Sequence, residues 1–194
     1  SLGGGYIPVS AVIMRREINN KVFGHLKRAQ VHSTTFGQND MGMAAGLATL
    51  HVMEEEKIVE RSESVGTKLL AGLMALKEKH EMIADVRGRG LIIGIEFHPP
   101  RNLAMKAAWS AIEAAEKGLF TQLIVMSLMR DHQILTQVGG PGVNIIKLLP
   151  PLIIGDDEVD MIVSAFDMIM GETKNLRGRV WATSGELIKQ AMSA

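Results

Sequence analysis

The spacing of apolar residues predicts a long helical region in the first half of the chain. From Met43 to Met53 apolar side chains recur at three- and four-residue steps, and the same spacing resumes after Lys57. The recurring positions are Met43, Leu47, Leu50, Met53, Ile58, Val65, Leu69, Leu73 and Leu76. We therefore expect two helices, or one kinked helix, over residues 40–56 and 58–80, with Asp40 as the N-cap of the first.

Short runs rich in β-branched and apolar residues predict strands. These runs cover residues 9–14, 83–87, 91–97, 134–138 and 144–149. Gly88-Arg89-Gly90 separates the second run from the third and is typical of a hairpin turn. The run from Val9 to Met14 follows a glycine-rich start, and we expect it to form a short, mostly buried strand.

The rest of the chain predicts further helices and an organisation into two domains followed by a tail. Further predicted elements are a helical turn over 16–23, a loop over 24–38 and helices over 103–117, 119–129 and 156–171. Acidic residues at 156–158 suit the first turn of the last helix, where they complement the helix dipole. We expect residues 1–60 to be the end of a larger domain and residues 61–172 a small α+β domain. Residues 173–194 are more polar, with a weak helical pattern from Gly185, and are expected to form an appended, partly helical tail.

Composition narrows the classes of protein that fit. Apolar residues make up 46% of the 194 positions and charged residues 22%, as in soluble globular proteins. The formal net charge is zero, so we expect neither nucleic acid nor an anionic membrane as a partner. The chain has no cysteine, which excludes disulfides and thiolate metal sites and fits a reducing cytoplasm. The longest apolar run, residues 118–129, is shorter than the roughly 20 residues of a membrane span, and we interpret it as a buried helix.

Two short segments carry groups that could hold a phosphate. Thr34 and Thr35 stand in a glycine-containing loop ahead of the long helix, where hydroxyls and backbone N–H groups are suitable donors. The alternative is that they only cap the helix, as Ser and Thr commonly do. Gly3-Gly4-Gly5 permits positive φ and close approach of a ligand or another strand, but no Gly-Lys-Ser/Thr follows it.

Five segments, taken in order, resemble one enzyme family. They are Ser1-Leu2-Gly3-Gly4-Gly5, His32 to Asn39, the helix with Glu54-Glu55-Glu56, Val86-Arg87-Gly88-Arg89-Gly90-Leu91 and Leu149-Pro150-Pro151-Leu152. In this order and spacing, residues 1–170 resemble the C-terminal half of class III aminotransferases of the ornithine and ω-amino acid type. The resemblance implies the α/β type I fold of enzymes that use pyridoxal 5'-phosphate, and a homodimer with active sites shared between subunits.

The resemblance also implies roles for particular positions. The lysine that carries the cofactor as a Schiff base is expected immediately before Ser1, so no catalytic residue is assigned within the chain. Thr35 is expected to bind the phosphate of the cofactor held by the partner subunit, with Thr34 nearby. Arg87 and Arg89 are interpreted as structural residues of a turn. Lys147 stands where relatives that bind α-amino acids usually have Arg; a lysine offers no bidentate fork, so we expect an amine, ω-amino or long-chain substrate.

The resulting hypothesis is a transaminase that moves an amino group between an amine or amino acid and an aldehyde or keto acid. An aminomutase or amine lyase on the same fold remains open, as does a catalytically inert fragment that serves only in dimerisation or interaction. A metal site is not expected, because the six histidines form no ligand motif. His51 and Glu55, one helical turn apart, are interpreted as a surface pair.

Overall fold

The computed structural model describes residues 2–28, 30–140, 142–176, 178 and 180–183. The chain divides into two compact units, residues 1–59 and residues 60–194. The helical pattern predicted from Gly185 onward lies outside the described residues.

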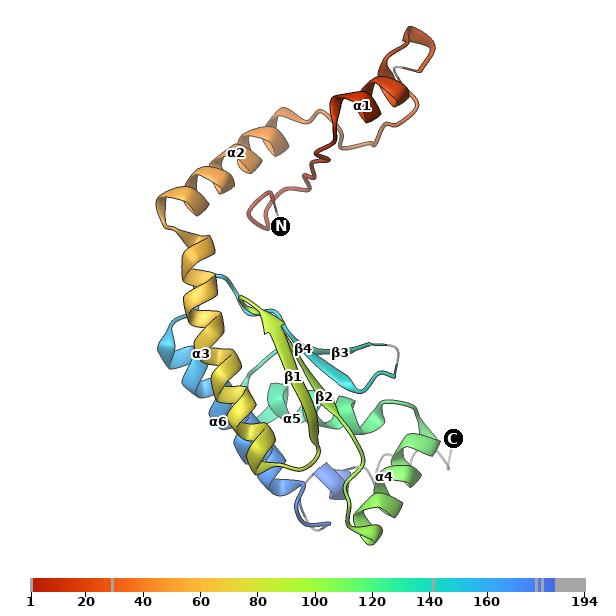
Figure 1. Ribbon diagram of the computed structural model, residues 1–194, viewed down its shortest axis with the longest axis vertical. Coiled ribbons are helices and arrows are strands. Elements are labelled where there is room, and N and C mark those ends of the chain that lie inside the picture. Colours follow the sequence, from red (N-terminus) through yellow and green to blue (C-terminus); the bar gives the residue numbers. More distant parts are fainter. Residues whose placement is uncertain (1, 29, 141, 177, 179, 184–194) are drawn as a thin grey trace. The chain divides into compact units, whose positions relative to one another are not determined.

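The first unit contains helices and extended segments. Helix α1 spans Arg16–Phe23, a 3₁₀ turn η1 spans Leu26–Arg28, and α2 spans Asp40–Glu55 (Figure 1). The helices and the intervening loop are as predicted. The N-cap is not Asp40 but Asn39, whose Oδ1 accepts a 3.0 Å hydrogen bond from the backbone N–H of Met41. Asp40 instead supplies acid to the first turn.

The predicted buried strand over Val9–Met14 is wrong. These residues have no regular secondary structure, and Val12 and Ile13 are 77% and 99% exposed. A strand requires backbone hydrogen bonds to a neighbouring strand. The described part of the first unit contains no other strand to provide them. The β-branched residues of this segment favour an extended backbone, but without a neighbouring strand they cannot form a β-strand.

The second unit is built on a four-stranded antiparallel sheet. Its strands are β1 Ile83–Arg89, β2 Ile92–Phe97, β3 Gln137–Gly139 and β4 Ile145–Leu148, in the order β1-β2-β4-β3. The β1–β2 hairpin turns at Gly90, which has the positive φ of +54° that glycine tolerates. All four strands were predicted, although β3 begins three residues later than expected. Alternation places Ile93, Ile95, Ile146 and Leu148 in the core.

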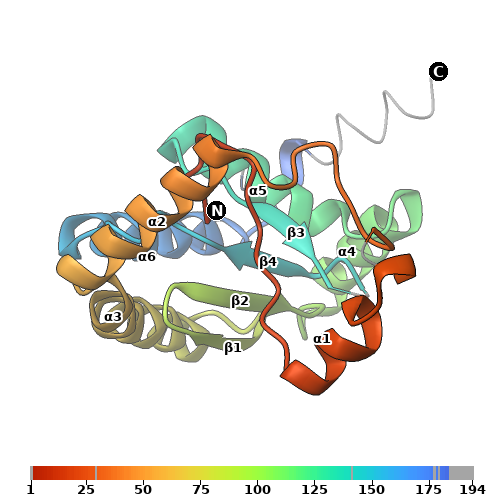
Figure 2. The same ribbon diagram turned by 90° about the horizontal axis from the view of Figure 1, so that it is seen from above.

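Four helices complete the second unit. They are α3 Ile58–Lys79, α4 Leu103–Ala115, α5 Leu119–His132 and α6 Asp156–Glu172, each close to its predicted range. Helices α3 and α6 lie side by side (Figures 1 and 2), and Lys68 of α3 donates to both carboxylate oxygens of Asp156 at 2.7 and 2.8 Å. Helix α5 has a buried face, on which Phe120, Ile124 and Leu128 are fully inaccessible, while Met126 and Met129 are exposed, so the predicted burial of this apolar run holds for one face.

The residues after α6 are not a simple appendage. Val180 and Trp181 are only 1% and 5% exposed, and the Trp181 ring centroid lies 5.5 Å from that of Phe120 in α5. The indole Nε1 donates to the carbonyl oxygen of Thr173 at 2.9 Å. The expectation of an appendage is therefore wrong for this part of the tail, because a single large aromatic residue secures it to the core.

None of the helices in the described ranges combines the length and the apolar character that a membrane-spanning helix requires.

Candidate functional site

The loop that contains Thr34 and Thr35 leads directly into α2. Both threonines are exposed, and the carbonyl oxygen of Thr34 accepts a 3.0 Å hydrogen bond from the backbone N–H of Gly37. This bond closes a tight turn three residues before Asp40, the first residue of the helix. Neither threonine hydroxyl has a hydrogen-bond partner among the described residues, and Asn39 serves as the cap instead. The two hydroxyls are therefore accessible to a ligand.

A cleft of about 890 Å³ lies beside this loop within the first unit. Thr34 lines it, together with His32, Ser33 and Gln38 of the same loop and with Gly42 at the start of α2. The segment before α1 contributes a second wall, formed by Pro8, Val9, Ser10 and Val12. Hydroxyl, imidazole and amide groups thus converge on one cleft near a helix N-terminus, an arrangement that can accept an anionic group.

The glycine run at the start of the chain forms a turn. Gly4 and Gly5 have φ of +66° and +84°, values that other residues adopt with strain. A Cβ atom on Gly3 would lie 2.1 Å from the carbonyl oxygen of Ile7, so the backbone folds closely onto itself there. The close approach is to the chain's own backbone.

Lys147 belongs to the second unit, on strand β4. Its neighbours Ile146 and Leu148 are buried, while Lys147 is exposed on the other face of the sheet, opposite Gly94 of β2 and Gln137 of β3. The side chain lies over Gly139, because a Cβ atom there would stand 2.7 Å from Lys147 Cε and 3.2 Å from Nζ. The ammonium group is thus held along the sheet surface, available to a negatively charged group.

Arg87 is engaged within the β1–β2 hairpin. Its guanidinium donates to Asp85 at 2.9 Å and to Glu96 at 2.7 Å. The hydrogen bond from Arg87 holds the pKa of Asp85 below its usual value, assisted by the charge of Lys77. These contacts fit the structural role expected of this segment.

The histidine-containing pair on α2 is a surface contact. His51 Nε2 lies 3.2 Å from Glu55 Oε1, and both side chains are more than 60% exposed, as interpreted from the sequence. Within the described part of the chain, no three His, Asp or Glu side chains gather closely enough to hold a metal ion.

The sequence pattern did not indicate the second wall of the cleft. Residues 9–14 were expected to form a buried strand, and only the tertiary structure shows that Val9, Ser10 and Val12 line the cleft with the threonine loop. A run of Ser, Thr and Gly ahead of a helix was the available signal for the first wall. No local signal marks the second.

Residues 1–170 match the family model described as aminotransferase class-III. The chain is 36% identical over 171 residues to alanine–glyoxylate aminotransferase 2 homolog 2, mitochondrial, of Arabidopsis thaliana, covering 88% of this chain and 32% of that protein. It is 38% identical over 167 residues to ornithine aminotransferase 1 of Staphylococcus aureus, covering 86% and 34%. Ethanolamine-phosphate phospho-lyase homolog 1 of Caenorhabditis elegans is 32% identical over 169 residues, covering 87% and 33%.

Solved structures of the same kind match the fold. The ornithine aminotransferase of Toxoplasma gondii superimposes with a TM-score of 0.68 at 26% identity, covering 90% of this chain and 36% of that one. An amine transaminase from an uncultivated Pseudomonas species, in its PLP-bound form, gives 0.67 at 26% identity, with 86% and 35% covered. The fold is thus that of the corresponding part of these enzymes. The chain spans about a third of the length of the relatives it matches.

Proposed function

The chain belongs to the class III aminotransferase family, and from this premise we propose that it forms part of a transaminase that depends on pyridoxal 5'-phosphate. The enzyme would move an amino group between an amine or amino acid and an aldehyde or keto acid. The observation that carries this proposal is the family match over residues 1–170, which includes the loop with Thr34 and Thr35. The bound cofactor supplies the electron sink for this chemistry.

The threonine loop fits the phosphate of such a cofactor. The hydroxyls of Thr34 and Thr35 are exposed and have no hydrogen-bond partner in the described chain, so they can donate to phosphate oxygens. Hydrogen bonds to a charged acceptor are about twice as strong as neutral ones. In this proposal Thr35 is the principal phosphate ligand and Thr34 lies beside it.

The lysine that carries the cofactor is proposed to stand immediately before Ser1 in the polypeptide. The codon that precedes Ser1 in the gene tests this directly. A codon for any other residue would remove the catalytic assignment and leave the fold unaffected.

The enzyme is further proposed to be a homodimer in which Thr35 reaches the cofactor held by the partner subunit.

Lys147 is proposed to face the acidic or polar end of the substrate. Its exposed ammonium on β4 attracts a carboxylate but does not bind it through two parallel hydrogen bonds. An amine, an ω-amino acid or a long-chain substrate therefore suits this position better than a standard α-amino acid.

The test uses the polypeptide encoded by the reading frame that contains this chain. Amino transfer from a panel of amines and ω-amino acids is measured with the cofactor present, together with the visible absorbance of the lysine-bound cofactor. Thr35→Val should weaken cofactor binding by roughly tenfold or more, because it removes a hydrogen bond to a charged group. Thr67→Val is the matched control, since Thr67 only donates to the carbonyl oxygen of Glu63 in α3. Equal cofactor affinity in both variants contradicts the phosphate role.

Mixing two variants tests sharing between subunits. One subunit carries an alanine in place of the lysine before Ser1, and the other carries Thr35→Val. If Thr35 acts across the dimer, a mixed dimer contains one intact site and regains activity at limiting cofactor. If it acts within its own subunit, both sites of the mixed dimer stay defective.

A lyase is the second candidate, because one relative is named as a phospho-lyase. The products distinguish the two reactions. A transaminase requires a carbonyl acceptor and aminates it, whereas an amine lyase releases ammonia without one. Ammonia release with no acceptor present would favour the lyase.

A further inference from the structure

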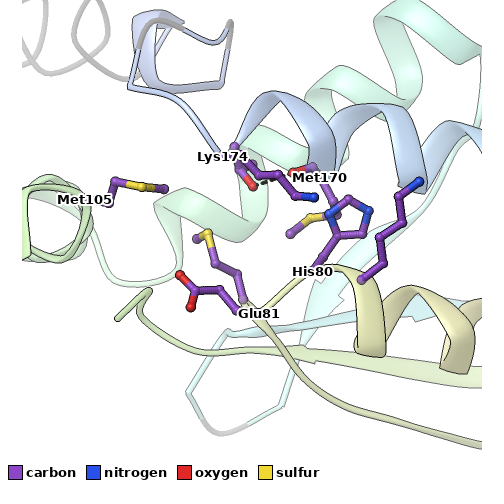
Figure 3. Close-up of a pocket in the computed structure, with 8 residues that line it drawn as sticks. His80, Glu81, Met105, Met170 and Lys174 are labelled. Atoms are coloured by element: carbon purple, nitrogen blue, oxygen red, sulfur yellow. Dashed lines mark hydrogen bonds between the residues drawn. The ribbon is translucent and has the colours of Figure 1, made fainter. Parts of the chain in front are cut away.

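A second pocket, of about 230 Å³, lies within the second unit where α3 and α6 end (Figure 3). None of the residues that line it belongs to the site proposed above. Met82, Met105 and Met170 provide its apolar lining, and two of them, Met82 and Met170, are almost fully buried. Methionine side chains are flexible and polarisable, so they adapt to ligands of irregular shape. The pocket can therefore accept an apolar body.

The polar end of the pocket contains a buried histidine with an unused nitrogen. His80, the residue after α3, is 2% exposed, and its Nε2 lies 2.6 Å from Asp167 Oδ1. Because a carboxylate only accepts, Nε2 carries the hydrogen of this bond, and Nδ1 is the ring nitrogen left over. Nδ1 is buried and has no hydrogen-bond partner. Buried polar atoms are nearly always paired, so this nitrogen indicates a missing partner.

Among the charged side chains at the pocket, Lys174 is a cation that forms no ion pair with a described carboxylate. Asp167 accepts from Lys79 Nζ at 2.5 Å as well as from His80, so its charge is compensated. Glu81 also lines the pocket; its carboxylate keeps its charge and accepts from the backbone N–H of Arg101 at 3.3 Å. Lys174 has no ion-pair partner among the described residues, and in Figure 3 its side chain extends toward His80.

We propose that this pocket binds a small organic carboxylate, with its apolar body against the three methionines and its carboxylate between Lys174 and His80. In the complex both ring nitrogens donate, Nε2 to Asp167 and Nδ1 to the ligand. The charged groups around the ring are Asp167, with Lys79 paired to it, and Lys174. Glu81 lines the same pocket, but its carboxylate points away from His80 (Figure 3). Drug-sized ligands need roughly 300 Å³ or more, so the ligand is about as large as benzoate.

The test titrates sodium benzoate into the polypeptide that contains this chain, labelled at methionine methyl groups and histidine ring nitrogens, and follows it by NMR. Saturable shifts are expected at the methyls of Met82, Met105 and Met170. Met161 and Met168, exposed on α6, are internal controls that should not move. In the complex the Nδ1 resonance of His80 should be that of a protonated nitrogen. Benzamide, of the same size but uncharged, should bind at least about tenfold more weakly.

Two lysine variants make the test specific. Lys174→Met should weaken benzoate binding by about tenfold, because it removes the cation. Methionine has a similar length, and the position is exposed, so the fold should not change. Lys68→Met breaks the exposed ion pair between Lys68 of α3 and Asp156 at the start of α6. Because neither residue lines this pocket, the affinity should stay unchanged. Equal affinity for benzoate and benzamide, equal effects of both variants, or an unprotonated Nδ1 in the complex would each overturn the proposal.

Discussion

His80 and Asp167 are joined by a 2.6 Å hydrogen bond that links the end of α3 to α6 across 87 positions of sequence. The same carboxylate accepts from Lys79 at 2.5 Å. Asp167 thus compensates two groups of the neighbouring helix, and the buried imidazole depends on it for its only hydrogen bond among the described residues.

Asp167→Asn should lower the free energy of unfolding by about 1 kcal/mol at neutral pH, since the pair is partly exposed and screened. Lys79 first and His80 second hold the pKa of Asp167 below its usual 3.8. A lowered carboxyl pKa stabilises the fold above 3.8, and this contribution is lost as the pH falls through the folded-state value. Urea unfolding at neutral and acidic pH should show the difference from wild type shrinking in acid. Asp160→Asn, at an exposed site on the same helix, should have no such effect.

Gly66→Ala should destabilise the second unit by about 3 kcal/mol. A Cβ atom on Gly66 of α3 would lie 2.2 Å from both the carbonyl carbon and oxygen of Gly90, and backbone cannot rotate away as a side chain can. Gly171→Ala is the matched control, because nothing lies within 4 Å of its Cβ position. That change should be neutral or stabilise by about 0.5 kcal/mol. Similar unfolding midpoints for the two variants would refute close packing of α3 on the hairpin turn.

Trp181 should contribute strongly to stability although it lies in the polar tail. Trp181→Ala should cost about 3–5 kcal/mol, through loss of the buried ring and its contact with Phe120. Trp181→Phe keeps an aromatic ring but loses the Nε1 hydrogen bond to Thr173, and should cost about 1 kcal/mol. Thermal unfolding followed by circular dichroism measures both. A negligible effect of the alanine variant would mean that the tail does not belong to the core.

Arg87→Gln should raise the pKa of Asp85 toward its usual value, because the hydrogen bond from Arg87 is the largest cause of its depression. NMR titration of the Asp85 carboxyl carbon measures the change directly. Lys77 remains 3.6 Å from Asp85 in the variant, so part of the depression should persist. An unchanged titration would show that the guanidinium does not hold this carboxylate in solution.

Lys147→Arg should shift substrate preference toward α-amino acids. A guanidinium on β4 can bind a carboxylate through two parallel hydrogen bonds, which an ammonium cannot. We expect the ratio of kcat/KM for an α-amino acid to that for a simple amine to rise by about tenfold. Steady-state kinetics on the polypeptide that contains this chain provide the measurement. Lys106→Arg, on α4, tests for a general effect of the substitution. An unchanged ratio in Lys147→Arg removes Lys147 from the substrate site.

Local pattern was sufficient for most helices and strands. The steps from Met43 to Leu76 predicted α2 and α3, and the glycines at 88 and 90 predicted the hairpin between β1 and β2. In the second unit each predicted strand pairs with a neighbouring strand of the sheet, so the local preference for extended backbone agrees with the tertiary structure. The N-cap of α2 was predicted one residue away from its true position, because Asn39 and Asp40 are both favourable caps and local sequence does not separate them.

Where local pattern failed, a distant contact decided the outcome. Val9–Met14 has the composition of a strand but lacks a neighbouring ladder in the described first unit. Trp181 follows a polar stretch, yet its ring reaches Phe120 in α5. The second wall of the cleft beside Thr34 likewise comes from residues more than twenty positions earlier.

Helix periodicity, glycine turns and ordered motifs are properties of short segments, so they were sufficient to predict the family and most of the helices and strands. The pairs of groups that meet depend on tertiary packing: His80 with Asp167, Lys147 with Gly139, and Thr34 with the other residues of its cleft. Such contacts depend on the packing of elements far apart in the chain, and no local preference encodes the distance between two side chains brought together in this way.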